Sequence, residues 1–556
     1  MTSSFFSELE SFLEKNPQYH PHTSDPDLEH DLEQALSKED LKSLGLAESA
    51  LFPILRRLPR MHLQTDPEKT RIKSPFRSLP HLKRLLITKA LAQLYLCYPI
   101  ENPFSMILFT WVIADGWGDY YTQKHIARLL SNTYPHLNLT LVTLIHEEKQ
   151  IPSETEWNEI ILRYSGEINQ PINYQPFSKH LCTQFQAADL VLEAPTPFLD
   201  LFRYAAREKT LRIGEHSALR SYPYHPRTGA YSMGLHFLET GILCKELTTE
   251  RCFHEGQFSM LYEKSYWDTH TFNCGYTKTI RSTYLYLLTL CHLLRKTPKD
   301  CDICMLHMPH LSVVLDKYFT TPASRGSQFL LRCSVKEIQI YEKGKCTHIP
   351  IAEKGKLLRL YATERLSQSE AITLMKFSQH LIGCTGDQSL LEAIATKIPF
   401  FYDPPPLKRQ FLSDLHWIAS SRISERLAKF FDLQLNNPDL PLGPIDNGWI
   451  SEEDLRICSD RLSLHEDTEE KIAISLANHL ENPNLSSDFK TLHEILQTEY
   501  AFEPFLLGLI NRTWLHLRNP ALAAFESQEI NAFATGGQNG KTTLGNIIHK
   551  LREIKK

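Results

Sequence analysis

The chain has 556 residues, with 60 Lys and Arg against 65 Asp and Glu, and its formal net charge is −5. This length suffices for roughly three or four domains, and 42% hydrophobic with 22% charged residues excludes wholesale disorder. Lys and Arg form no basic block, so no nucleic-acid partner is expected. The longest apolar segments, such as Phe104–Ala114, fall well short of the roughly 20 residues of a membrane-spanning helix.

The first residues, MTSSFFSELESFLEKNP, lack the basic start and the long apolar stretch of a Sec signal peptide. The cysteines lie mostly inside apolar segments, which is typical of reduced, buried thiols. Cys301 and Cys304 form a C-x-x-C within an expected buried strand, so a metal or redox site is not predicted there. We expect a cytoplasmic protein, although composition does not distinguish this from secretion by a non-Sec route.

Residues 1–100 are predicted to form a helical N-terminal extension, because Leu and Phe recur at three- to four-residue spacing. Residues 101–268 open with FSMILFTWVI, which is typical of a strand buried on both faces. A Gly-rich turn, an amphipathic helix and the strand LTLVTLI follow, and further strands are expected at 188–195 and 210–216. This βαβ order predicts a first Rossmann-like domain with a parallel sheet.

Residues 269–430 are predicted to form a second Rossmann-like domain. A helix is expected over 279–295, and strands are expected for CDICMLHM, QFLLRCSV, VKEIQIYE and KLLRLYA. Ser367 and Glu370 fit the start of a further helix, after which the strand 380–383, a Gly-rich turn, a helix and the strand 399–403 complete the domain. Residues 431–556 are predicted to be a helical C-terminal region. The fold class is therefore α/β with helical ends, and ligands are expected at the carboxyl ends of the parallel strands.

The motif Gly-Cys-Thr-Gly-Asp-Gln-Ser at 383–389 joins a predicted buried strand to a helix. The first N–H groups of a helix have no intrahelical partner, and the helix dipole is positive there. Gly386 permits close backbone approach, and Thr385 and Ser389 add hydroxyl donors, so the turn can bind a phosphate or diphosphate. The alternative is a plain helix cap in which Asp387 or Ser389 satisfies the first amides.

Asp115 and Asp119 lie in the turn Asp-Gly-Trp-Gly-Asp at the carboxyl end of the first predicted strand. A third glycine is missing where a dinucleotide-binding motif would have one, since that position is Tyr121. Two carboxylates at the top of a sheet are well placed to supply a general base. The alternative is structural, with Asp115 stabilising the turn and Asp119 capping the next helix.

These two motifs resemble those of GT-B glycosyltransferases, the broad group that includes the MurG-like enzymes and the UDP-N-acetylglucosamine 2-epimerases. The resemblance covers roughly residues 100–430. It implies two facing Rossmann-like domains, with the nucleotide-sugar donor bound by the C-terminal domain (269–430) and the acceptor by the N-terminal one (101–268).

Within this group, the spacing is most similar to the protein-arginine rhamnosyltransferases (EarP-type). Their Asp-x-x-Gly-Asp looks like Asp115 to Asp119, and this likeness implies that Asp119 is the base and Asp115 its support. Their donor motif Gly-Glu-Asp-Ser is similar to Gly386-Asp387-Gln388-Ser389, where Asp replaces Glu and Gln replaces Asp. The same likeness implies that Gln388 and Ser389 hold the donor.

Four further side chains are candidates for donor binding. Lys278 could meet a donor phosphate, and Arg359 and Tyr361 share one face of a strand, where they could line the nucleotide site. Glu392 could accept hydrogen bonds from ribose hydroxyls. Each has a structural alternative: a solvated lysine, packing within the sheet, or a surface helix glutamate.

The sequence thus predicts a nucleotide-sugar-dependent glycosyltransferase, with protein side chains as one candidate class of acceptor. No metal or other cofactor is expected, because helix-end amides and a basic side chain can stabilise the leaving diphosphate. The alternatives are a sugar-nucleotide epimerase and a non-catalytic binding protein that keeps the fold.

Overall fold

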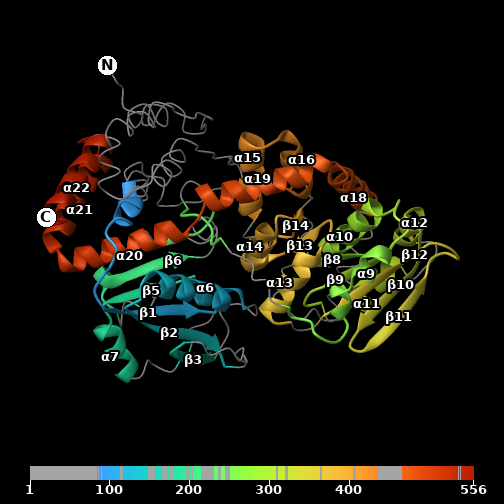
Figure 1. Ribbon diagram of the computed structural model, residues 1–556, viewed down its shortest axis with the longest axis horizontal. Coiled ribbons are helices and arrows are strands. Elements are labelled where there is room, and N and C mark those ends of the chain that lie inside the picture. The colour runs from blue at the N-terminus through green and yellow to red at the C-terminus, as the bar shows by residue number, and fades with distance from the viewer. Residues whose placement is uncertain are drawn as a thin grey trace, which may run out of the picture. The chain divides into compact units, whose positions relative to one another are not determined.

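The computed structural model describes residues 84, 87–88, 91–112, 117–147, 157–165, 173–174, 179–195, 201, 205–214, 231–235, 239–244, 251–277, 279–308, 311–319, 324–363, 366–404, 409–435, 466–535, 537–538 and 540–555. By its internal contacts the chain divides into two compact units. Unit 1 comprises residues 1–243 and 498–556, and unit 2 comprises residues 244–497. Figure 1 shows a sheet in each unit.

The sheet of unit 1 has the strand order β4-β3-β2-β1-β5-β6-β7. Its strands are β1 (Phe104–Trp111), β2 (Leu137–His146), β3 (Glu159–Ser165), β4 (Asn173–Tyr174), β5 (Leu190–Glu193), β6 (Thr210–Gly214) and β7 (Tyr231–Ser232). All neighbouring strands pair in parallel except β3 and β4. The first predicted Rossmann-like sheet is therefore confirmed.

Helices cover both faces of this sheet, as in a doubly wound α/β fold. One face packs on α7 (Lys179–Ala187) through a buried cluster that includes Phe109, Val142 and Phe185. The helix α6 (Gly118–Thr133) contacts β1 and β2, and its Tyr120 packs on Ile145. The apolar spacing that predicted this helix is confirmed.

The sheet of unit 2 has the order β11-β10-β12-β9-β8-β13-β14. Its strands are β8 (His270–Gly275), β9 (Asp300–Met305), β10 (Val335–Glu342), β11 (Lys345–Pro350), β12 (Lys356–Ala362), β13 (Ile382–Cys384) and β14 (Phe400–Tyr402). All pairs are parallel except the β10–β11 hairpin. A second Rossmann-like unit is therefore confirmed as well.

The helices of unit 2 include η5 (Ser259–Tyr262), α9 (Lys264–Thr269), α10 (Ile280–Leu293), α11 (Leu311–Phe319), α12 (Arg325–Arg332), α13 (Gln368–Phe377), α14 (Gly386–Thr396), α15 (Arg409–Arg422), α16 (Glu425–Leu435), α18 (Glu466–Leu480) and most of α19 (Pro483–Glu499). The predicted capping box of Ser367 and Glu370 is present at α13. The strand predicted for QFLLRCSV was wrong, because Ser324 caps a helix there by accepting from the Ser327 N–H.

The helices that follow residue 497 belong to unit 1 and not to a separate C-terminal region. They are α20 (Glu503–Arg518), α21 (Pro520–Ala534) and α22 (Gly540–Lys555). Ile242 forms a parallel bridge with Ala501, so the chain leaves unit 1 and returns to it at one place. The helices predicted for the first 83 residues lie outside the described residues. No helix in the described part of the chain has both the length and the apolar character needed to cross a membrane.

Candidate functional site

In each sheet the strand order reverses direction at one point, and ligands of open α/β sheets bind in the crevice at such points. In unit 2 the reversal lies between β8 and β13, since α10 leads from β8 to β9 and α14 leads from β13 to β14 on the opposite side. The starts of α10 and α14 therefore meet the same edge of the sheet. In unit 1 the reversal lies between β1 and β5.

Two glycines bring β8 and β13 together at the reversal point of unit 2. A Cβ on Gly275 would lie 2.6 Å from the Tyr286 ring, and one on Gly383 would lie 3.0 Å from the Gly275 Cα. The Tyr286 hydroxyl donates to the carbonyl oxygens of Cys274 (2.8 Å) and Leu381 (3.0 Å), which fixes its ring beneath both strands. The sequence therefore allows a close strand contact directly below the start of α14.

Gly386 leaves open space at the start of α14. Gly386, the first residue of the helix, has φ +70°, and a Cβ there would meet no atom within 4 Å. Thr385 is the N-cap but makes no side-chain cap hydrogen bond, because its hydroxyl donates to the Asp403 carbonyl oxygen at 2.7 Å. The Ser389 hydroxyl accepts from the Thr385 N–H at 3.1 Å. The Ser389 hydroxyl in turn donates to the Thr385 carbonyl oxygen. Ser389 thus satisfies a backbone amide, as the predicted alternative had it, and the two hydroxyls that were predicted to donate to a phosphate donate within the protein instead.

The neighbouring loops converge on this turn. The Asp403 carboxylate, at the end of β14, accepts from the Thr279 N–H at 3.2 Å, and the Thr279 side chain accepts from the Ser282 N–H to cap α10. Asp387 lies half-buried in the first turn of α14, where a negative side chain is favoured by the helix dipole. Burial raises the pKa of the Tyr402 phenol well above its ordinary value, and the negative charge of Asp387 raises it further.

Glu392 is buried and is held by two amides. Its Oε1 accepts from the Gln388 side chain at 2.6 Å and from the Gln368 side chain, at the start of α13, at 2.7 Å. Burial raises the pKa of the Tyr276 phenol, and the charge of Glu392 raises it further. Glu392 is therefore a positioned carboxylate and not a surface helix residue.

Arg359 and Tyr361 are not brought to this turn. The strands β9 and β8 lie between β12 and β13, a separation of about 14 Å at about 4.8 Å per strand. The Arg359 guanidinium binds the carboxylates of Asp300 (2.9 Å) and Asp302 (3.2 Å), and Tyr361 stacks on Tyr341 with ring centroids 5.0 Å apart. These contacts fit the alternative stated for Arg359 and Tyr361, which was packing within the sheet. Lys278, the other candidate, lies outside the described residues.

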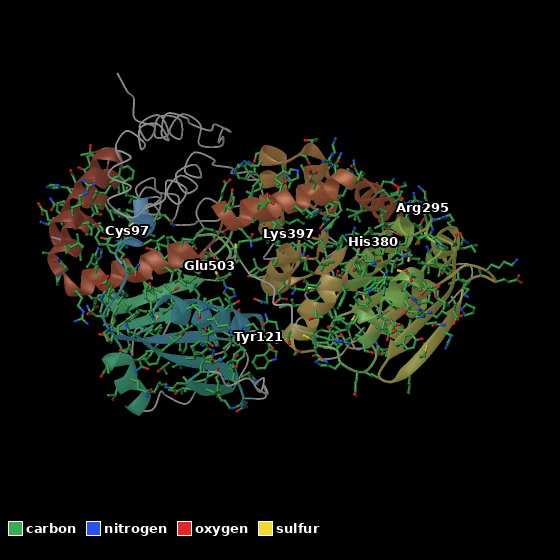
Figure 2. The ribbon with its side chains drawn as sticks, viewed as in Figure 1. Cys97, Tyr121, Arg295, His380, Lys397 and Glu503 are labelled. Atoms are coloured by element: carbon green, nitrogen blue, oxygen red, sulfur yellow. The ribbon has the colours of Figure 1, made fainter. Side chains whose placement is uncertain are left out.

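Asp119 lies at the reversal point of unit 1. It is the second residue of α6, in its first turn, and is half-buried. The N-cap of α6 is Trp117, so the alternative in which Asp119 caps this helix was wrong. Figure 2 labels Tyr121 in the same helix and Lys397 at the end of α14. Asp115 lies outside the described residues.

Two residues at the edge of unit 2 were missed by the sequence analysis. Gln368 contacts Glu392 across a separation of 24 residues, which no periodicity predicts. His307 follows β9 with φ 52° and lies edge-on to Tyr276, with ring centroids 5.3 Å apart. The position of His307 just after a buried strand was a usable signal. In the described part of the chain, no group of three or more His, Cys, Asp or Glu is arranged to hold a metal ion.

No protein-family model matches the chain, and no curated protein matches it. Solved structures similar to it include a family 9 glycosyl transferase from Veillonella parvula, at 12% identity, TM-score 0.29, 66% of this chain and 100% of that chain. MurG from Acinetobacter baumannii has 10% identity, TM-score 0.30, and coverage of 71% and 99%. A glycosyltransferase from Rickettsia africae has 10% identity, TM-score 0.32, and coverage of 75% and 100%. The two doubly wound sheets follow from the strand orders of the chain itself.

Proposed function

We propose that the protein is a nucleotide-sugar-dependent glycosyltransferase. The open start of α14 carries this proposal: a glycine with φ +70° and empty space around its Cβ position precedes helix N–H groups at the reversal point of a parallel sheet. The motif resemblance at 383–389 supports the same assignment. The helix-end interaction contributes on the order of 0.3–2 kcal/mol, so other groups of the loops must add to donor binding.

In this proposal the donor diphosphate binds the turn from Thr385 to Ser389, with Gly386, Asp387 and Gln388 around it. Glu392, held by its two glutamine amides, accepts hydroxyl hydrogen bonds from the nucleoside. Lys278 stays a candidate phosphate ligand. No metal is required, because helix-end amides stabilise the leaving diphosphate. Unit 1 binds the acceptor, for which protein side chains are one candidate class.

The test is a thermal-shift panel of UDP-, dTDP- and GDP-sugars and their nucleoside diphosphates. At least one is expected to raise the melting temperature. Gly386→Ala should abolish that shift, because the new methyl group occupies the space next to the turn. Gly344→Ala is the matched control, since Gly344 has φ +73° and equally open surroundings but lies in the β10–β11 hairpin. No shift with any ligand, or loss of binding in both variants alike, would contradict the proposal.

A second prediction concerns Asp119 as the base that accepts the acceptor proton, with Asp115 supporting it. Asp119→Asn keeps the size and half-buried place of the side chain but removes its basicity. We expect transfer, or hydrolysis of the donor, to fall by at least about 100-fold, while the dissociation constant for nucleotide changes less than about threefold. Activity assays with the sugar nucleotide found in the panel measure both. Interconversion of the free sugar nucleotide without an acceptor would identify an epimerase instead.

A further inference from the structure

Tyr402 lies in the sheet at the level where α14 begins. It is the last residue of β14 and pairs with Cys384, which stands two residues before Gly386. The preceding side chain, Phe401, faces α10, since its ring centroid is 6.2 Å from that of Tyr286. Side chains alternate along a strand, so Tyr402 faces the opposite side of the sheet, where α14 contacts β14. Its ring therefore lies beneath the first turn of α14.

The hydroxyl of Tyr402 is a buried donor that the fold does not use. The side chain is 1% exposed, and within the described part of the chain its hydroxyl meets no hydrogen-bond partner. Because burial raises the pKa of the phenol, it stays protonated at neutral pH and has a hydrogen to donate. A buried polar group without a partner costs free energy, so its presence requires an explanation.

Asp387 presents the opposite problem. It lies half-buried in the first turn of α14, beside the place proposed for the diphosphate. The helix dipole favours this negative side chain in the absence of a ligand, but the same charge repels a diphosphate. Among the charged groups that act on the Tyr402 phenol, Asp387 has the largest effect on its pKa. The unused donor and the repelling carboxylate are therefore neighbours.

One hydrogen bond would resolve both problems. We propose that Tyr402 is a positioning residue, whose hydroxyl donates to the Asp387 carboxylate when a diphosphate occupies the α14 turn and so holds that negative charge away from the ligand. This inference rests on the proposed function. Asp387 need not be unpaired beforehand, because the charge of the ligand supplies the repulsion that turns its side chain inward.

The test compares Tyr402→Phe with the unaltered full chain. Removal of the unused hydroxyl should raise the melting temperature without ligand by about 1–4 °C. The titration uses whichever of UDP, dTDP and GDP stabilises the unaltered protein. Its dissociation constant should rise about 10- to 100-fold in Tyr402→Phe, because a hydrogen bond to a charged group is lost. Higher stability together with weaker binding distinguishes this role from a purely structural one.

Two further variants isolate the hydrogen bond. In Asp387→Asn the repelled charge is absent, so the addition of Tyr402→Phe should change the dissociation constant less than about twofold. Tyr341→Phe makes the same change in β10, where the hydroxyl donates to the Gln339 side chain at 3.1 Å. This control should leave the dissociation constant unchanged and should not raise the melting temperature.

The outcomes separate the two proposals. Binding by the unaltered protein with an unchanged dissociation constant in Tyr402→Phe would overturn the role of Tyr402 and leave the proposed function in place. Equal weakening by Tyr402→Phe with Asp or Asn at position 387 would also overturn it, as would a lower melting temperature, which would show that the hydroxyl is already satisfied. If the unaltered protein binds none of the three diphosphates, the proposed function fails and this inference fails with it.

Discussion

Glu526 is fully buried in unit 1 and accepts hydrogen bonds from helices far apart in the sequence. The Tyr95 hydroxyl donates to it at 2.5 Å and the Arg512 guanidinium at 2.6 Å, and the His516 ring lies 3.2 Å away. Burial alone would raise the pKa of its carboxyl group, but the charge of Arg512 and the hydrogen bonds from His516 and Tyr95 lower this pKa to about 2. These three partners therefore stabilise the ionised form of the Glu526 carboxyl group.

Because the folded-state pKa of Glu526 lies below its ordinary value of 4.5, its contribution to stability is present above about pH 4.5 and is lost as the pH falls toward 2. Glu526→Gln leaves the Arg512 guanidinium buried without its counter-charge, so unfolding of unit 1 should become easier by about 3–5 kcal/mol at pH 7. The difference from the unaltered protein should shrink at pH 3 in thermal melts. Glu553→Gln, at an exposed ion pair with Lys550, is the control and should have no measurable effect.

The pairing of β8 with β13 sets the position of the α14 turn. This pairing depends on Gly275, because the Tyr286 ring fills the space where a side chain would lie. The ring cannot easily move, since its hydroxyl is bonded to carbonyl oxygens on both sides of the contact. Packing at this point therefore links the stability of the sheet to the geometry of the candidate site.

Gly275→Ala should destabilise unit 2 by about 1–3 kcal/mol, because the new methyl group overpacks the core. It should also weaken nucleotide binding, since β13 shifts and takes the α14 turn with it. Chemical denaturation and ligand titration measure the two effects. Gly545→Ala makes the same change inside α22, where the surroundings are open, and should stabilise by about 0.5–1 kcal/mol. A Gly275→Ala protein as stable as the unaltered one would contradict this prediction, because the Tyr286 ring would then have moved to make room for the methyl group.

The chain divides into two compact units, and each contains buried apolar residues. Chains built from such units commonly unfold in more than one step. Calorimetry should therefore resolve two transitions. Nucleotide should raise only the transition temperature of unit 2, and Gly275→Ala should lower that temperature. Glu526→Gln should lower only the transition temperature of unit 1. A single transition that responds equally to all three changes would contradict this independence.

The sequence predicted regular elements well where they are long and strongly patterned. The segment KLLRLYA coincides with β12, and the first strand begins at Phe104 as expected. The error at α12 arose because Phe329 and Leu330 lie in an apolar stretch whose neighbour Leu331 is exposed, so composition hid a helix with one buried side. Ser324 was the overlooked cap.

The candidate site was only partly predictable for a physical reason. The α14 turn could be predicted because strand, glycine and helix start are local features. The hydrogen bond from Gln368 to Glu392 depends on packing between helices distant in sequence. The left-handed backbone of His307 is set by hydrogen bonds to other loops. Likewise, the return of α20 to unit 1 is decided by contacts with Tyr95 and Tyr134 and not by the composition of α20.

The bridge between Ile242 and Ala501 also constrains how the protein is made. The Ile242 N–H donates to the Tyr500 carbonyl oxygen at 2.7 Å, and the Phe502 N–H donates to the Ile242 carbonyl oxygen at 2.9 Å. During synthesis, unit 1 therefore waits for residues that are made after the whole of unit 2. At about 5–20 residues per second, residues 244–556 take roughly 15–60 s to translate. Over that time unit 2 can complete its core, while the core of unit 1 still lacks the helices α20, α21 and α22.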